Sequence, residues 1–269
     1  MNAKKRDKIW NTGIAVTGYL LAIALIYLCG NAVAASRAVA ATERYPNLYV
    51  AGEQAGFAQP EQKTVYFTFD DGPSRNTEKI LNMLQEEGIK ATFFVTAQEE
   101  NKELAVQMLR RIVEEGHTLG LHTYSHKFKE IYQSADTYLA DIDKLNTYIV
   151  ETIGAYPAIL RFPGGSATSN ATKEVIREII GEIARRGYLY YDWDVVSGDQ
   201  TGKILSPEEI ARNIVSGVEG KKNAIVLCHD SGAPKTTAEG VRLAIHRLRE
   251  QGYVFEPITC EVPPKHFRE

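Results

Sequence analysis

The sequence has few cysteines and little net charge, and each shortage excludes a class of protein. Only three of its 269 residues are cysteine, with no Cys-x-x-Cys spacing, so the pattern indicates neither a disulfide framework nor a cysteine metal site. We expect Cys228 and Cys260 to be buried thiols in strands, with a bridge between them as the alternative in an oxidising compartment. A formal net charge of −3 gives no electrostatic reason to expect nucleic acid as a partner.

One long apolar run is present, and it lies at the N-terminus. Four basic residues within positions 4–8 precede apolar residues 14–29, and small-x-small sites follow. This order is typical of an export signal. The run is near the lower limit of what spans a bilayer, roughly 17–25 residues, so we expect residues 1–35 to be either a cleaved signal or a membrane anchor. The basic end would stay inside, which leaves the rest of the chain outside at the cell membrane, or secreted after cleavage.

The rest of the chain divides into a linker over 36–62, one domain over 63–260 and a C-terminal tail over 261–269. One sizeable domain is the default because a chain of this length can bury most of its apolar surface in a single core. Apolar runs in the domain predict strands at Val65–Phe69, Ala91–Val95, Thr118–Leu121, Ile159–Phe162, Leu189–Val196, Ala224–Cys228 and Val254–Ile258. Amphipathic segments between them predict helices over 76–87, 102–115, 135–153, 170–186, 206–219 and 236–250. This alternation predicts repeated βα units and a parallel sheet.

Unusual polar residues lie where these strands end. Asp70 and Asp71 end the first strand, His122 the third, Arg161 the fourth and His229 the sixth. In an open doubly wound sheet and in a closed barrel alike, ligands bind at the carboxyl ends of the strands. Because the polar residues are spread over several strand ends, the pattern favours a barrel over a single crevice.

Two imidazoles and one carboxylate among these residues predict a metal site. Asp71, His122 and His126 suit zinc, with cobalt, nickel or manganese as alternatives. Adjacent strand residues point to opposite faces, but the turn at Gly72-Pro73 lets Asp70 reach the same centre. Asp70 would then stay free to accept a proton from water, so the set predicts a metal-assisted hydrolase.

Three further features fit hydrolysis. His229, at the mouth of the fold, is a candidate general acid for a leaving amine or alkoxide, although a lone strand-end histidine is more often structural. Arg161 ends an apolar strand and could pair with Asp70 and hold it ionised. Gly164 and Gly165 let backbone N–H groups approach a substrate closely, as an oxyanion hole requires.

These motifs resemble the polysaccharide deacetylase family, also called the NodB-homology domain or carbohydrate esterase family 4. The resemblance covers about residues 63–259 and rests on the strings TFDDGPS, HTYSH, RFPGG, DWDVVSGD and LCHDS, in that order. It implies a distorted (β/α) barrel with seven strands. It also implies removal of acetyl groups from N-acetylglucosamine-type polymers such as peptidoglycan and chitin, with some members acting on acetylxylan.

The resemblance assigns a role to each candidate site residue. It implies Asp70 as the base, with Arg161 as its partner, and His229 as the acid, assisted by Asp199. It implies that Asp71, His122 and His126 are the metal ligands. It also implies that Gly164 is the backbone oxyanion donor and that Leu227 is a wall of the acetate pocket. The chain departs from the common family pattern after the fifth strand. Val196 stands where many members have an acid, and Gln200 where they have the aromatic that closes on the acetyl methyl, with Trp193 nearby. We therefore expect a wider and more polar acyl pocket.

Taken together, the sequence predicts an exported, metal-dependent hydrolase that removes N-acetyl groups from cell-wall amino sugars. Its predicted partners are a polysaccharide, peptidoglycan or a chitin-like chain, and the membrane through the N-terminal segment. A chitooligosaccharide deacetylase or an acetylxylan esterase is the alternative enzyme. An inactive wall-binding module is the alternative of another class, and the complete set of motif residues argues against it.

Overall fold

The computed structural model describes residues 44–51, 56–200, 202–232 and 236–268. Internal contacts divide the chain into two compact units, Met1–Pro46 and Asn47–Glu269. The predicted signal or anchor over 1–35 lies outside the described residues. Among the residues that are described, no helix is long and apolar enough to cross a membrane.

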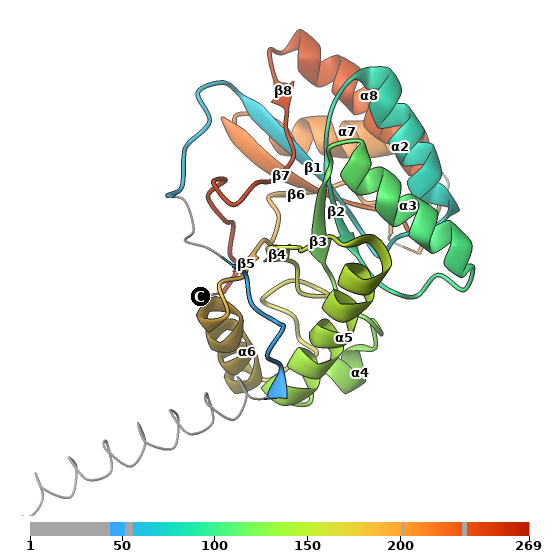
Figure 1. The fold of residues 1–269 in the computed structure, drawn as a ribbon. Coiled ribbons are helices and arrows are strands. Elements are labelled where there is room, and N and C mark those ends of the chain that lie inside the picture. The colour runs from blue at the N-terminus through green and yellow to red at the C-terminus, as the bar shows by residue number, and fades with distance from the viewer. Residues whose placement is uncertain (1–43, 52–55, 201, 233–235, 269) are drawn as a thin grey trace, which may run out of the picture. The chain divides into compact units, whose positions relative to one another are not determined.

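The second unit alternates parallel strands with helices (Figure 1). Its strands are β1 (Thr64–Asp70), β2 (Thr92–Val95), β3 (Thr118–Leu121), β4 (Ile159–Leu160), β5 (Leu189–Tyr190), β6 (Val195–Val196), β7 (Asn223–His229) and β8 (Val254–Phe255). Its helices are α2 (Arg75–Glu87), α3 (Lys102–Glu114), α4 (Phe128–Ile131), α5 (Ala135–Ile153), α6 (Lys173–Arg185), α7 (Pro207–Val218) and α8 (Thr237–Glu250). The sheet order is β5-β4-β3-β2-β1-β7-β6, and β8 pairs with the start of β1.

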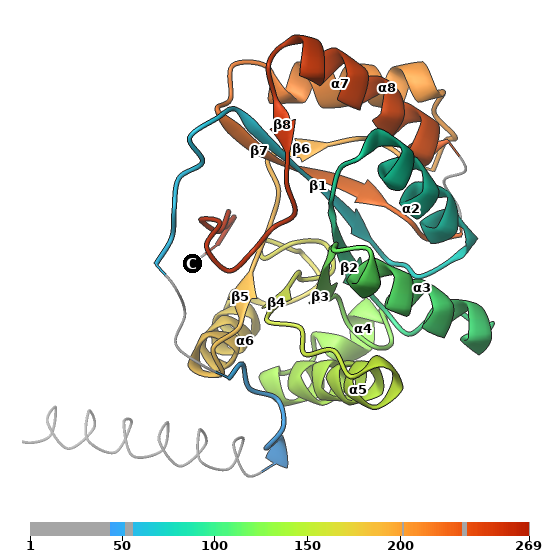
Figure 2. The same cartoon turned by 45° about the horizontal axis from the view of Figure 1, so that its top comes forward.

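The sheet is curved into an open barrel. Strands β5 and β6 lie at the two ends of the sheet order, yet only residues 191–194 join them. A connection of this length spans at most roughly 17 Å, so the two edges of the sheet must curve toward each other. Helices form an arc along the outer side of the sheet in Figure 2, and neighbours contact one another in the series α7, α8, α2, α3, α5, α6. The predicted distorted (β/α) barrel is therefore confirmed.

The predicted fifth strand, 189–196, is wrong as a single strand. Leu189 and Tyr190 pair with β4, whereas Val195 and Val196 pair with β7. Between these two pairs the backbone also binds a side chain, because the carbonyl of Tyr191 accepts a hydrogen bond from Arg161 Nε at 2.8 Å. The described residues thus contain eight strands instead of seven. Helix α4 was also missed, because four residues are too short to show a helical period.

Strand β1 is buried on both faces and organises the core. Its alternate side chains point to opposite sides of the sheet. Phe67 and Phe69 stack on Phe255 and Phe93, with ring centroids 5.7 and 5.1 Å apart. Tyr66 belongs to a different buried cluster, which consists of Tyr66, Phe94, Ile159, Tyr191, Ile225, Ile258 and Val262. The side of β1 that carries Tyr66 is also the side that carries Thr68 and Asp70, toward the carboxyl end of the strand.

The segment after β8 runs back toward β5 (Figures 1 and 2). The hydroxyl of Tyr190 donates to the carbonyl of Arg268 at 2.5 Å, and the N–H of Asp192 donates to the carbonyl of Lys265 at 2.8 Å. Both cysteines are free thiols, and Cys228 is buried in β7 as predicted. The prediction is wrong for Cys260, which is half-buried in a turn after β8. The predicted domain limits of 63 and 260 leave these C-terminal contacts outside, whereas the compact unit extends from Asn47 to the end of the chain.

Two helix glycines test the packing of α7 against α8. A Cβ on Gly240 of α8 would lie 2.6 Å from Ile210 of α7, whereas a Cβ on Gly181 of α6 would meet nothing within 4 Å. We expect Gly240→Ala to lower the free energy of unfolding by about 1–3 kcal/mol through overpacking. Gly181→Ala should raise it by up to about 1 kcal/mol through helix propensity. Urea unfolding of both variants measures the difference, and equal effects would contradict the packing described here.

Candidate active site

A cavity of about 260 Å³ opens at the carboxyl ends of the strands. Eight of the ten candidate site residues line it: Asp70, Asp71, His122, His126, Gly164, Gln200, Leu227 and His229. The other two, Arg161 and Asp199, lie behind them and contact Asp70 and His229. Phe128 of α4 and Trp193 also line the cavity. The fold therefore brings the ten predicted residues to one cavity or directly behind it.

The turn after β1 brings both carboxylates to the cavity. Asp71 has a φ of 76°, and the Gly72-Pro73 peptide bond is cis. Ser74 caps α2, so neither aspartate is needed for that purpose. The buried carboxylate of Asp230 stabilises the turn by accepting the Gly72 N–H at 2.8 Å. A Cβ on Gly72 would lie 2.0 Å from Asp230 Oδ2, so the close approach requires glycine.

Burial raises the pKa of Asp230 to about 7. Asp230 belongs to the LCHDS string, but the motif pattern assigns it no role. Its position directly after His229, at a strand end, was the available signal. Asp230 also accepts a hydrogen bond from Thr77 Oγ1 at 2.6 Å, and this contact ties the turn to the first turn of α2.

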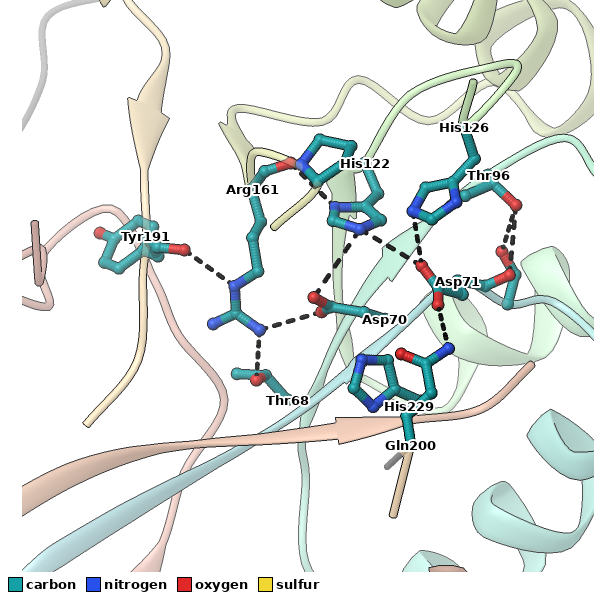
Figure 3. Close-up of polar contacts among 12 residues, drawn as sticks. Thr68, Asp70, Asp71, Thr96, His122, His126, Arg161, Tyr191, Gln200 and His229 are labelled. Carbon is teal, nitrogen blue, oxygen red and sulfur yellow. Dashed lines mark hydrogen bonds and ion pairs between the residues drawn. The ribbon is translucent and has the colours of Figure 1, made fainter. Parts of the chain in front are cut away.

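Asp71, His122 and His126 form a candidate metal site (Figure 3). Their ligand atoms all lie within 4.8 Å of one another. Asp71 Oδ1 is 3.3 Å from His122 Nε2 and 3.1 Å from His126 Nε2. His122 Nδ1 lies 2.9 Å from the carbonyl oxygen of Arg161. A carbonyl only accepts, so this Nδ1 carries a proton. In the neutral ring Nε2 then has the lone pair that a metal ligand requires, and in the charged ring the same Nε2 donates to Asp71.

The charges of the three residues also fit a cation. Burial alone would raise the pKa of the Asp71 carboxyl, but hydrogen bonds from His122 and His126 outweigh burial and hold this pKa far below its usual range. Burial lowers the pKa of His122, and the neighbouring carboxylates of Asp70 and Asp71 raise it to a net value above normal. A half-buried, ionised carboxylate beside two imidazoles is a donor set that suits a divalent metal.

The loop between the two histidines is held by a residue that the sequence analysis missed. Asp141 of α5 accepts the backbone N–H groups of Tyr124 at 2.5 Å and Ser125 at 3.2 Å. Thr123 and His126 have φ values of 133° and 52°, so this loop is not a continuing helix. No sequence signal distinguished Asp141 from the other polar residues of an amphipathic helix.

Asp70 is held by a fully buried arginine (Figure 3). Arg161 Nη1 donates to Asp70 Oδ1 at 2.9 Å and to Thr68 Oγ1 at 2.6 Å. The second oxygen, Asp70 Oδ2, lies 3.8 Å from His122 Nε2 and so faces the candidate metal site. One carboxylate oxygen is therefore occupied by Arg161, and the other is directed at the ligand set.

His229 lies beside Asp70, because the two residues are register partners in the β1–β7 pairing. Its Nδ1 is 2.8 Å from Asp199 Oδ1, and its backbone N–H donates to Asp199 Oδ2 at 2.8 Å. Thr237 Oγ1 also donates to Asp199 Oδ2, at 2.9 Å. Burial lowers the pKa of His229, but the hydrogen bond and the charge of Asp199 raise it to a net value above normal. The imidazole is therefore kept protonated to higher pH.

The remaining cavity wall combines apolar side chains with one amide. Leu227 and Trp193 are apolar wall residues, and Gly164 contributes exposed backbone. Gln200 Nε2 donates to Asp71 Oδ2 at 3.0 Å, so this side chain is turned toward the ligand set. Gln200 thus lies in the cavity, and its effect on the acyl pocket stays a prediction.

Known proteins are similar to this chain in sequence and fold. Residues 58–179 match the family model for polysaccharide deacetylase. A peptidoglycan-N-acetylglucosamine deacetylase of Bacillus cereus is 29% identical over 204 residues, which cover 74% of this chain and 71% of that protein. The putative polysaccharide deacetylase YheN of Bacillus subtilis is 29% identical over 208 residues, which cover 76% and 70%.

A solved structure gives the same result. The catalytic domain of a peptidoglycan N-acetylglucosamine deacetylase from Eubacterium rectale superimposes with a TM-score of 0.75 at 34% identity, covering 80% of this chain and 96% of that one. The resemblance drawn from the motifs is thereby confirmed over most of the second unit. This chain belongs to the polysaccharide deacetylase family.

Proposed function

We propose that this protein is a metal-dependent deacetylase that removes N-acetyl groups from glucosamine-type residues of peptidoglycan. The observation that carries the proposal is a pair of groups that share one cavity with the ligand set. Asp70 and His229 are register partners that line one cavity with Asp71, His122 and His126. An ionisable base and a protonated imidazole beside a cation site are what amide hydrolysis needs.

The residues divide the reaction between them. Asp71, His122 and His126 would hold a divalent cation, which when bound would supply Lewis-acid polarisation of the acetamide carbonyl. Asp70 Oδ2 takes a proton from the attacking water as the water oxygen bonds to the carbonyl carbon. Arg161 stays on Oδ1 and keeps the carboxylate in place. The products are acetate and a free amine.

Gly164 and His229 act on the two ends of the breaking amide. The N–H of Gly164 makes no hydrogen bond to another described residue, and Gly164 lines the cavity. It donates to the carbonyl oxygen as negative charge develops there. His229 gives its proton to the leaving nitrogen as the C–N bond breaks. Asp199, on the other ring nitrogen, stabilises the imidazolium form.

The substrate and location follow from the relatives and from the N-terminus. The Bacillus cereus and Eubacterium rectale relatives carry the name of peptidoglycan N-acetylglucosamine deacetylase. A signal or anchor over residues 1–35 would bring the domain outside the membrane and beside the wall. Zinc is the proposed metal, with cobalt, nickel or manganese as substitutes, because two imidazoles and a carboxylate suit these ions.

Acetate release tests the proposal directly. We expect the protein to release acetate from peptidoglycan, to lose this activity after dialysis against a strong chelator, and to regain it with zinc or cobalt. Parallel assays on chitooligosaccharides and acetylxylan separate the alternative substrates. A preference for either would replace peptidoglycan in the proposal, and release from none of the three by the metal-loaded protein would leave the inactive wall-binding module.

Two substitutions separate the base from the ligand. Asp70→Asn should retain metal and lose about 10²–10⁴-fold in kcat, because it removes only the proton acceptor. Asp71→Ala should lose both metal and turnover. Metal content by atomic absorption and acetate release by the same preparations measure the two effects. A site emptied by Asp70→Asn but not by Asp71→Ala would mean that the two roles are exchanged.

The pH dependence tests His229 as the acid. Since Asp199 raises the pKa of His229 above its usual value, the protonated form persists above the usual range, and kcat/KM should fall only as pH rises through that raised pKa. Asp199→Asn removes the negative charge, so the alkaline limb should move to lower pH. Thr237→Val, which deletes one hydrogen bond to Asp199 but keeps its charge, is the matched control and should leave the limb near its original position. An unmoved limb in folded Asp199→Asn would exclude His229 as the acid.

A further inference from the structure

The loop that carries Gly164 has little structure of its own. It lies between β4 and α6, and Gly164 and Gly165 have φ values of 76° and 78°. Two short turn bonds hold its backbone internally, from Gly165 N–H to the Phe162 carbonyl at 2.8 Å and from Thr168 N–H to the Gly165 carbonyl at 3.1 Å. A backbone donor aimed at a substrate must be fixed in direction to be useful, so this loop needs support from elsewhere in the chain.

A buried carboxylate supplies that support. Asp192 is fully buried, and its oxygens accept from Ser166 N at 2.8 Å and Ser166 Oγ at 2.5 Å. The same carboxylate accepts the backbone N–H of Phe267 at 2.7 Å. Arg268 N–H donates in turn to Ser166 Oγ at 2.9 Å. Asp192 and Ser166 therefore join the Gly164 loop to the C-terminal segment.

Ring packing reinforces these hydrogen bonds. A Cβ on Gly165 would come within 3.0 Å of Trp193 and 3.3 Å of Phe267. Trp193, which lines the cavity, meets Phe267 edge to face with centroids 5.0 Å apart. The ring of His266 stacks on Tyr190 at 3.8 Å. The C-terminal segment thus packs on Tyr190 of β5 through His266 and against Gly165 of the loop through Phe267.

We propose that Lys265–Arg268 is a strap that positions the Gly164 N–H, acting through Asp192 and Ser166. The strap residues are positioning residues, since none of them lines the cavity. The inference rests on the proposed function, in which Gly164 donates to the carbonyl oxygen of the substrate. Loss of one oxyanion donor typically costs about 10²–10³-fold in kcat, so a misdirected donor should cost part of that.

Asp192→Asn in the full chain is the main test. It keeps the volume of the side chain but turns an acceptor into a donor opposite groups that themselves donate. We expect kcat on an N-acetylated glycan to fall about 10–100-fold, with KM and zinc affinity unchanged. Asp194→Asn is the matched control, because its carboxylate accepts Ile225 N–H on β7 and, among the described residues, makes no contact with the glycine loop. Its only tie to the strap there is a half-exposed ion pair with Lys265 Nζ at 3.5 Å, and such pairs contribute little. This variant should keep kcat within about threefold.

Phe267 tests the strap itself. Phe267→Ala removes the ring behind Gly165 and should lower kcat several-fold, whereas Phe267→Tyr keeps the ring and should restore it. These two variants decide the matter if Asp192→Asn does not fold. Wild-type kcat in folded Asp192→Asn or in Phe267→Ala, or an effect on KM alone, would overturn the strap.

Hydrogen exchange separates failure of the strap from failure of the proposed function. If the wild-type protein releases no acetate, the proposed function fails, and the strap is judged by exchange of the Gly165 and Thr168 amides, which bond within the loop. The strap requires faster exchange of both amides in Phe267→Ala and normal exchange in Phe267→Tyr, measured by NMR. Unchanged exchange in Phe267→Ala would overturn it.

Discussion

The buried guanidinium of Arg161 is the constraint on which the rest of the site depends. A charge in a protein interior costs several kcal/mol unless it is paired and hydrogen-bonded, and removing one partner of a buried pair typically costs about 3–5 kcal/mol. Arg161 meets this requirement with Asp70, Thr68 and two carbonyls, and it lies 4.3 Å over the ring of Phe94. The carbonyls belong to residues 191 and 192. The connection between β5 and β6 must therefore pass over the guanidinium, and this is where the expected strand divides in two.

The same arginine couples the base to the metal ligands. Its side chain holds one oxygen of Asp70, while its main-chain carbonyl receives the Nδ1 proton of His122. A shift of Arg161 would therefore disturb the orientation of Asp70 and the tautomer of His122 at once. The ring of Phe94, which belongs to the buried apolar cluster, packs against the guanidinium. The packing of the barrel interior therefore determines the position of Arg161, and through it the positions of Asp70 and His122. In this sense the apolar core positions the chemistry.

The sequence predicted what is local and missed what is long-range. Strand ends marked by Asp71, His122 and His229 could be recognised because each interrupts an apolar run, and parallel strands bring their carboxyl ends to one edge. The division of strand 189–196 could not be recognised, since it depends on a guanidinium thirty residues earlier in the chain. Asp141 and Asp192 were missed for the same reason. Their carboxylates accept backbone N–H groups from distant loops, and nothing in an amphipathic helix or a strand end specifies that partner.

The surroundings of Asp71 and of His229 shift their pKa values in opposite directions, and this difference suits the proposed reaction. On one side, hydrogen bonds from His122 and His126 keep the pKa of Asp71 low, so a carboxylate stays available to bind a cation. On the other side, Asp199 keeps the pKa of His229 high, so a proton stays available to give. Environments that push the pKa values of neighbouring groups apart keep one group ionised and another protonated at a single pH. Asp70 and His229 are register partners on adjacent strands, so a substrate amide between them would meet a proton acceptor at its carbonyl end and a proton donor at its nitrogen.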